Sequence, residues 1–249
     1  MQNQFDPRTT TSGHDPAISV GVPRAARDAG LRSYMLKVYN YMASGVLLTG
    51  IVALLFAPYA QDVLISANGR GLSGLGWLIT FAPLGFVFAM SFGVNRMQTS
   101  TLQILFWSFA AVMGLSMSTI FIVYTGVSVA QTFFAVTAAF LGLSLWGYTT
   151  KKDLSGFGTF LIMGVVGLLV AMIINIFMQS SAMSLAISAI GVLLFAGLTA
   201  YDTQRIKSMY AHVAGTDMMG KVVIMGALSL YLDFVNMFQF LLSFMGDRR

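Results

Sequence analysis

Long uncharged, apolar runs separated by short charged segments dominate this sequence. The uncharged runs cover 38–61, 71–95, 97–150 and 154–201, and a last apolar stretch, 222–246, contains one charged residue, Asp233. About 20 apolar residues in a helix cross the hydrocarbon core of a bilayer, so the first two runs and the last stretch each predict one span. The two middle runs, of 54 and 48 residues, are too long for one helix each.

Turn-forming residues divide both long runs near their middles. Tyr124-Thr125-Gly126 interrupts the first, and Gln179-Ser180-Ser181 interrupts the second. In the third span, Ala110, Gly114 and Ser118 recur every four residues, which predicts a small-residue face for close helix packing. The fold class is therefore all-α, a polytopic membrane protein with seven transmembrane helices. We expect the spans near 39–60, 73–94, 101–123, 128–149, 157–178, 183–202 and 222–246.

Composition supports the membrane class, because 57% of the residues are hydrophobic and only 9% are charged. The absence of cysteine excludes disulfides, thiol catalysis and cysteine-ligated metals, and the absence of glutamate leaves aspartate as the only side-chain carboxylate. The net charge of +5 does not indicate nucleic-acid binding, since the basic residues flank the membrane segments.

The basic residues also predict an orientation. With the N-terminus in the cytoplasm, eleven of the fourteen Lys and Arg residues fall in cytoplasmic segments and three fall outside. Because cytoplasmic loops carry the excess of basic residues, this bias places the N-terminus inside. An odd number of spans then places the C-terminus outside.

The chain is expected to have three parts. Residues 1–23 are polar and rich in proline and predict a disordered tail. Residues 24–38 have an apolar face and basic residues, which indicates an interfacial amphipathic helix that leads into the first span. A simple extension of that span fits the same residues. The seven-helix domain then covers 39–246.

The last helix carries a polar stripe. Ser229, Asp233, Asn236 and Ser243 lie at offsets 0, 4, 7 and 14, on one face of a helix otherwise made mainly of apolar residues. An aspartate at the centre of a membrane helix costs about 2.5–3.5 kcal/mol on insertion scales. We therefore expect this helix to be central in the bundle with Asp233 inside. A purely structural role for Asp233 remains an alternative.

Two other ionisable residues are candidates for the same site. Asp202 ends the sixth span, where it is either solvated, a cap, or a partner of Asp233. Arg96 follows the second span, and its position alone indicates an ordinary cytoplasmic anchor. If Asp202 and Asp233 meet, they would share a proton and titrate as a unit. Loss of that proton would leave two repelling anions, which suit a hard cation such as Ca²⁺.

Three segments of this sequence resemble the Bax inhibitor-1 family of transmembrane Bax-inhibitor-motif proteins, in its short bacterial form. They are SYMLKVYNYMASGVLLTG (33–50), FAGLTAYDTQRIK (195–207) and ALSLYLDFVNMFQFLLSF (227–244). The resemblance implies six helices around a central seventh, and a pH-sensitive calcium leak with Asp202 and Asp233 as the sensor. It also implies that Arg96 can bind the aspartate pair, and that the protein lies in a bacterial inner membrane.

Three functions are compatible with these features. The first is a calcium-permeable channel or leak that responds to protons, with calcium as a transported ion and no cofactor. The second is a non-transporting regulator of a membrane protease or of a cell-death or stress partner. The third, an aspartyl intramembrane protease, is disfavoured because Leu230-Tyr231-Leu232 precede Asp233 where such enzymes have Gly-x-Gly. We therefore expect no enzymatic activity, contact with the lipid bilayer, and no nucleic-acid partner.

Overall fold

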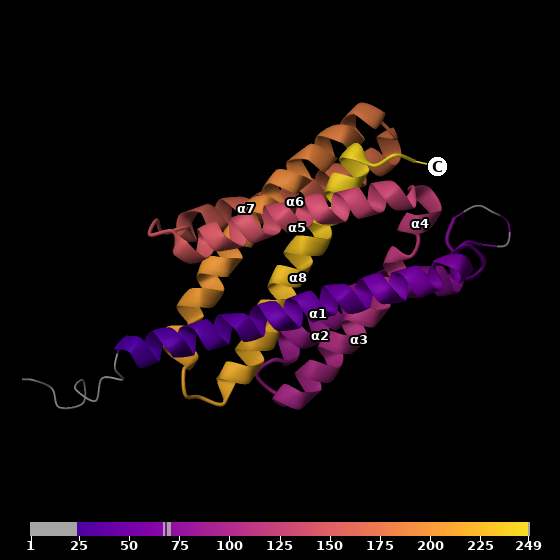
Figure 1. Ribbon diagram of the computed structural model, residues 1–249. Coiled ribbons are helices and arrows are strands. Elements are labelled where there is room, and N and C mark those ends of the chain that lie inside the picture. Colours follow the sequence, from indigo (N-terminus) through magenta and orange to yellow (C-terminus); the bar gives the residue numbers. More distant parts are fainter. Residues whose placement is uncertain (1–23, 67, 69–70, 249) are drawn as a thin grey trace, which may run out of the picture.

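A computed structural model describes residues 24–66, 68 and 71–248 as a bundle of long helices (Figure 1). Seven stretches are long and apolar enough to cross a bilayer, with α3 and α4 together forming one of them. This confirms the all-α, seven-span fold class for the described residues, whereas the tail 1–23 lies outside them. The helices are α1 (Arg24–Leu64), α2 (Gly74–Gly93), α3 (Thr99–Met117), α4 (Ile120–Val123), α5 (Gly126–Thr149), α6 (Ser155–Met178), α7 (Ser181–Val213) and α8 (Met218–Met245).

Both turns that divide the long apolar runs occur where the residues predict them. Thr125 is the N-cap of α5, and its side chain accepts a hydrogen bond from the Ser128 amide. Gln179 ends α6 in the left-handed region, with φ 50°, and Ser180 caps α7 by accepting from the Met183 amide. The capping side chains use the amides that a helix leaves without main-chain partners.

The first helix is continuous over 41 residues, so no break separates 24–38 from the first span. Its early part has a buried face made of Tyr34, Met35 and Val38, which pack into the main apolar core. Tyr34 lies against Tyr210 of α7, with ring centroids 5.4 Å apart. The helix is thus continuous with the first span, and whether its beginning lies at the membrane interface stays a prediction.

The third span bends at Ser118 and Thr119, between α3 and α4. The hydroxyl of Ser118 donates to the Leu115 carbonyl at 2.6 Å, and that of Thr119 donates to the Ser116 carbonyl at 3.0 Å. Such side-chain bonds compete with the main-chain ladder and are a known cause of helix bending. The span therefore consists of two helices rather than the single one expected from 101–123.

The small-residue face of α3 packs directly against α1. A Cβ added at Gly114 would lie 2.7 Å from both the Thr49 carbonyl oxygen and the Val52 Cβ. The Thr49 hydroxyl donates to the Ala110 carbonyl at 2.8 Å, again between these two helices. Small residues let membrane helices approach closely, so this contact confirms the predicted packing face.

The last helix is the most buried span. Over its most apolar stretch of 18 residues 61% of the residues are buried, against at most 33% in the same stretch of the other spans. It packs against α1, α3, α5 and α7, and its most extensive contact is with α7. The other helices expose many large apolar side chains, which suits surfaces that face lipid.

The two ends of the bundle differ in charge. The beginning of α1 and the connections α5–α6 and α7–α8 lie on the left of Figure 1, and the α2–α3 connection lies at the bottom of the view, where Thr99 contacts Gly220 at the start of α8. The exposed basic residues Arg32, Arg96, Lys151 and Lys152 belong to these segments. Because successive spans alternate in direction, the basic segments gather at one end of the bundle, as the sequence predicts. Which end faces the cytoplasm remains a prediction.

Candidate functional site

Asp233 lies inside the bundle near the middle of α8. Its side chain is 4% exposed, and its Oδ2 atom has no hydrogen-bond partner among the described residues. A buried carboxylate without partners is costly, because burial removes the water that solvates the charge. The sequence predicts an inward-facing Asp233, and the burial agrees with that prediction.

The packing of α7 along α8 sets where Asp202 lies relative to Asp233. The hydroxyls of Ser188 and Ser243 are 3.0 Å apart, which gives the antiparallel register of the two helices near their outer ends. Toward the other end, the Ile206 side chain packs against Gly226 in the same register. Continuing this register sets Asp202 level with Ser229, one helical turn or about 6 Å along the axis from Asp233.

The two aspartates are therefore neighbours across the α7–α8 contact. Asp202 is partly buried, and its carboxylate lies about one helical turn along the axis from that of Asp233. Within the described part of the chain, no hydrogen bond joins the two side chains. The arrangement is a carboxylate pair within electrostatic reach, with one member deep in the bundle and one nearer the basic end.

Few other charges face Asp233 from the helices packed around it. Neither α3 nor α5 contains a Lys, Arg, His or Asp residue, and the charged residues of α1 lie toward its two ends. On α7 the nearest basic residue is Arg205, one turn after Asp202 at i+3 spacing. The electrostatics of the site thus depend mainly on Asp202, Asp233 and Arg205.

Arg96 has a different position. It is exposed in the turn between α2 and α3, where its amide donates to the Gly93 carbonyl at 2.9 Å. In the described ranges no ion pair connects it to Asp202 or Asp233. The family resemblance implies Arg96 as the basic partner of the aspartates, and the sequence analysis gave Arg205 no role in the site. The i+3 spacing of Asp202 and Arg205 was the available signal for Arg205.

The polar stripe of α8 continues outward from Asp233. Ser229 is half-buried, and the Asn236 amide donates to the Leu232 carbonyl at 2.8 Å. Ser243 is more exposed and contacts Ser188 of α7. Beside this stripe, a cavity of about 430 Å³ lies between α6, α7 and α8. Its polar lining consists of Asn175, Ser184, Ser188, Asn236, Gln239 and Ser243.

A second polar contact joins three helices and was not foreseen from the sequence. The Thr49 hydroxyl on α1 lies 2.6 Å from the Tyr231 hydroxyl on α8, and Thr49 also donates to the Ala110 carbonyl on α3. Since the single Thr49 proton goes to Ala110, Tyr231 is the donor to Thr49. Both residues stand in apolar runs 182 positions apart, so no local pattern marks them.

Among the described residues, no group of three or more His, Cys, Asp or Glu side chains lies close enough to hold a metal ion. Ca²⁺ usually takes six to eight oxygen ligands, often from several carboxylates. The oxygens available here are those of two aspartates and of neutral Ser, Asn and Gln side chains. Such a set fits a transient contact with a hydrated cation better than a resident metal site.

Comparison with known proteins places the whole bundle in one group. Residues 31–249 match the family described as "Inhibitor of apoptosis-promoting Bax1". An uncharacterized protein of Rickettsia prowazekii is 47% identical over 223 residues, covering 89% of this chain and 92% of the relative. One from Caulobacter vibrioides is 46% identical over 228 residues, covering 89% and 91%. The inner membrane protein YbhL of Escherichia coli K12 is 42% identical over 224 residues, covering 89% and 94%.

Proposed function

We propose that this chain, which belongs to the Bax inhibitor-1 family of membrane proteins, forms a calcium-permeable leak controlled by protonation of Asp202 and Asp233. The observation that carries the proposal is the burial of Asp233, whose Oδ2 atom lacks a hydrogen-bond partner in the described residues. Ionisable residues inside membrane bundles are functional by default, because their burial is costly. By analogy with YbhL, we propose an inner-membrane location.

Protonation would control the contact between α7 and α8. With a proton on the pair, the two side chains carry at most one negative charge, and the helices stay packed. When that proton leaves, two anions one turn apart repel each other in a medium that screens charge poorly. The repulsion favours separation of α7 from α8, entry of water, or the arrival of a cation. We therefore expect calcium flux to rise as pH rises through the titration of the pair.

The polar cavity beside α8 supplies the outer half of the proposed route. Asn236 lines it and lies three residues, or about 4.5 Å along the axis, outward from Asp233. Amide and hydroxyl oxygens can replace part of the hydration shell of a hard cation without binding it tightly. Calcium would thus pass from neutral oxygens to the two carboxylates and on toward the basic end.

Arg205 gives this route a second control. Its positive charge lies one helical turn from the Asp202 carboxylate and opposes the passage of a cation. We propose that Arg205 partly neutralises the negative charge of Asp202 at the inner end of the route. Binding of the pair by Arg96, which the family resemblance implies, requires the α2–α3 turn to move and stays a prediction. The proposal includes no catalytic residue and no resident cofactor.

The proposal is tested by calcium flux in proteoliposomes that contain a calcium-sensitive dye, measured across a series of pH values. We expect flux from the intact chain to change with pH, and Asp233→Asn to lose that dependence. Asp62→Asn is the matched control, because Asp62 is an exposed aspartate near the end of α1. Unchanged pH dependence in Asp233→Asn would exclude the sensor. Absence of flux, with a stoichiometric co-purifying membrane protein, would favour a non-transporting regulator.

A further inference from the structure

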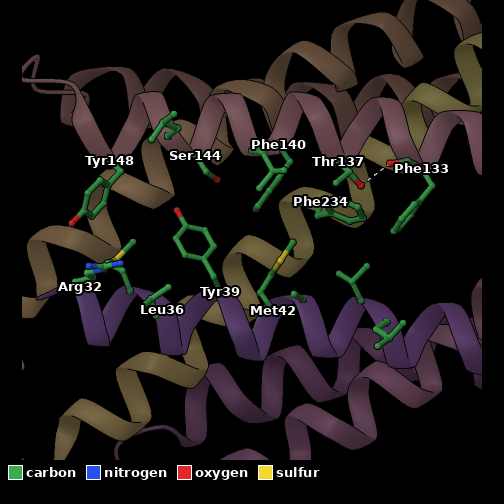
Figure 2. A pocket seen from close by; sticks show the side chains of 16 residues that line it. Arg32, Leu36, Tyr39, Met42, Phe133, Thr137, Phe140, Ser144, Tyr148 and Phe234 are labelled. Carbon is green, nitrogen blue, oxygen red and sulfur yellow. Dashed lines mark hydrogen bonds between the residues drawn. The ribbon is translucent and has the colours of Figure 1, made fainter. Parts of the chain in front are cut away.

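A long apolar groove separates α1 from α5 (Figure 2). Its first section is a cavity of about 590 Å³, bounded by α1 on one side and α5 on the other. Phe234 of α8 forms part of its floor. The α1 wall includes Leu36, Met42 and Leu47, and the α5 wall includes Phe140 and Leu145.

The groove continues toward the other end of the bundle. A second cavity of about 350 Å³ shares Val46, Leu47, Phe133 and Phe234 with the first and extends to Gly126 at the start of α5. Both cavities lie between helices that cross the bilayer. Because a membrane contains no empty volume of this size next to its acyl chains, something apolar fills the groove.

One end of the groove is basic and polar. Arg32 of α1 lines it at the end where α1 begins, together with the phenols Tyr39 and Tyr148 (Figure 2). Lys207 of α7 does not line the groove but lies beside it, because its Nζ donates to the Tyr148 carbonyl at 2.6 Å and lies 4.7 Å from the centre of the Tyr148 ring. Asp28, one turn before Arg32, is not among the lining residues.

We propose that this groove is a binding site for one phospholipid of the leaflet on that side, with an acyl chain between α1 and α5 and the phosphate at Arg32. The shape and the charge distribution match this ligand, because the groove is apolar along its length and ends at the Arg32 guanidinium and two phenol groups. Basic residues near a membrane surface favour anionic lipids by about 1 kcal/mol each. A lipid with a net negative headgroup, such as phosphatidylglycerol, should therefore bind better than a zwitterionic one.

A helix from another chain fits the groove poorly. An apolar helix would cover Arg32 without offering it an anion.

The site is tested by native mass spectrometry of the full chain, released from vesicles of equal parts phosphatidylglycerol and phosphatidylethanolamine. We expect one retained lipid per chain, enriched in phosphatidylglycerol. Arg32→Gln should reduce the enrichment about fivefold, the factor that corresponds to about 1 kcal/mol. Lys151→Gln is its control, since Lys151 is exposed at the same end but does not line the groove.

A second pair of variants separates loss of the site from loss of the fold. Ala43→Trp fills the groove from α1 and should remove the retained lipid, while Ala139→Trp, exposed on α5 outside the groove, should retain it. Equal retention in both tryptophan variants would overturn the proposal. So would a dimer of the intact chain that Ala43→Trp converts to a monomer, because a second copy would then occupy the groove.

Discussion

The hydrogen-bonded chain from Tyr231 through Thr49 to Ala110 makes an asymmetric prediction about stability. Tyr231 donates to Thr49, and Thr49 donates to the Ala110 carbonyl, so the three members are not equivalent. Tyr231→Phe removes the outer donor and leaves the Thr49 proton on Ala110. Thr49→Val removes the middle member and leaves the Tyr231 hydroxyl buried in an apolar core, since Tyr231 is 0% exposed.

The expected magnitudes follow from this difference. Hydrogen bonds between membrane helices contribute on average about 0.6 kcal/mol, and at most about 1.7 kcal/mol, so Tyr231→Phe should lower the free energy of unfolding by about that much. A buried donor without a partner costs about 1–3 kcal/mol, so Thr49→Val should cost more. In the double variant no unpaired phenol remains, and its loss should be no larger than that of Thr49→Val alone.

The measurement is the free energy of unfolding of the purified chain in mixed micelles, titrated with a denaturing detergent. All four forms of the double-mutant cycle are compared under the same conditions. A larger loss for Tyr231→Phe than for Thr49→Val, or two losses that simply add, would refute the donor assignment.

Three further predictions concern packing, pH and orientation. Gly114→Ala should lower the free energy of unfolding by about 1–3 kcal/mol through the clash with α1, whereas Gly142→Ala, which meets nothing within 4 Å, should be neutral or slightly stabilising; unfolding titrations that rank them the other way would contradict the packing. The side-chain hydroxyl and the backbone amide of Ser155 donate hydrogen bonds to the Asp153 carboxylate and lower its pKa below the usual 3.8. The stability that these bonds add is therefore present above pH 3.8, and it is lost as the pH falls through the lower pKa of the folded state. Thermal midpoints of Asp153→Ala and the intact chain should therefore differ at pH 6 and converge in acid, and a constant difference would contradict the assignment. Since the chain has no cysteine, Ser208→Cys should react with an impermeant thiol reagent only from the cytoplasmic side and Asn68→Cys only from outside; the opposite pattern would reverse the orientation.

The seven spans were predictable because membrane helices follow from local properties of the chain. Uncharged runs mark where the backbone can cross lipid, and Thr125 and Ser180 mark turns by capping the helices that follow. The bend at Ser118 was not predictable in the same way, since serine and threonine hydroxyls also occur inside straight helices. The length of α1 was left open between two readings because an amphipathic stretch beside a span fits both.

The site was only partly predictable for a related reason. Asp233 stands out because a carboxylate in the middle of an apolar helix has a large cost wherever the helix packs. Asp202 gained its role from resemblance, and its position level with Ser229 depends on how α7 and α8 pack, which no single segment encodes. The Thr49–Tyr231 contact joins two helices through ordinary-looking residues, so only the assembled bundle reveals it.

The claim that Asp202 and Asp233 act as one unit has a direct test in a double-mutant cycle of the pH response. The measured quantity is the ratio of calcium flux at two pH values on either side of the transition, in the same proteoliposomes, for the intact chain, Asp202→Asn, Asp233→Asn and the double variant. A shared proton predicts that each single substitution abolishes the response as completely as both together. Two partial losses that multiply in the double variant, or a full response in either single variant, would contradict it.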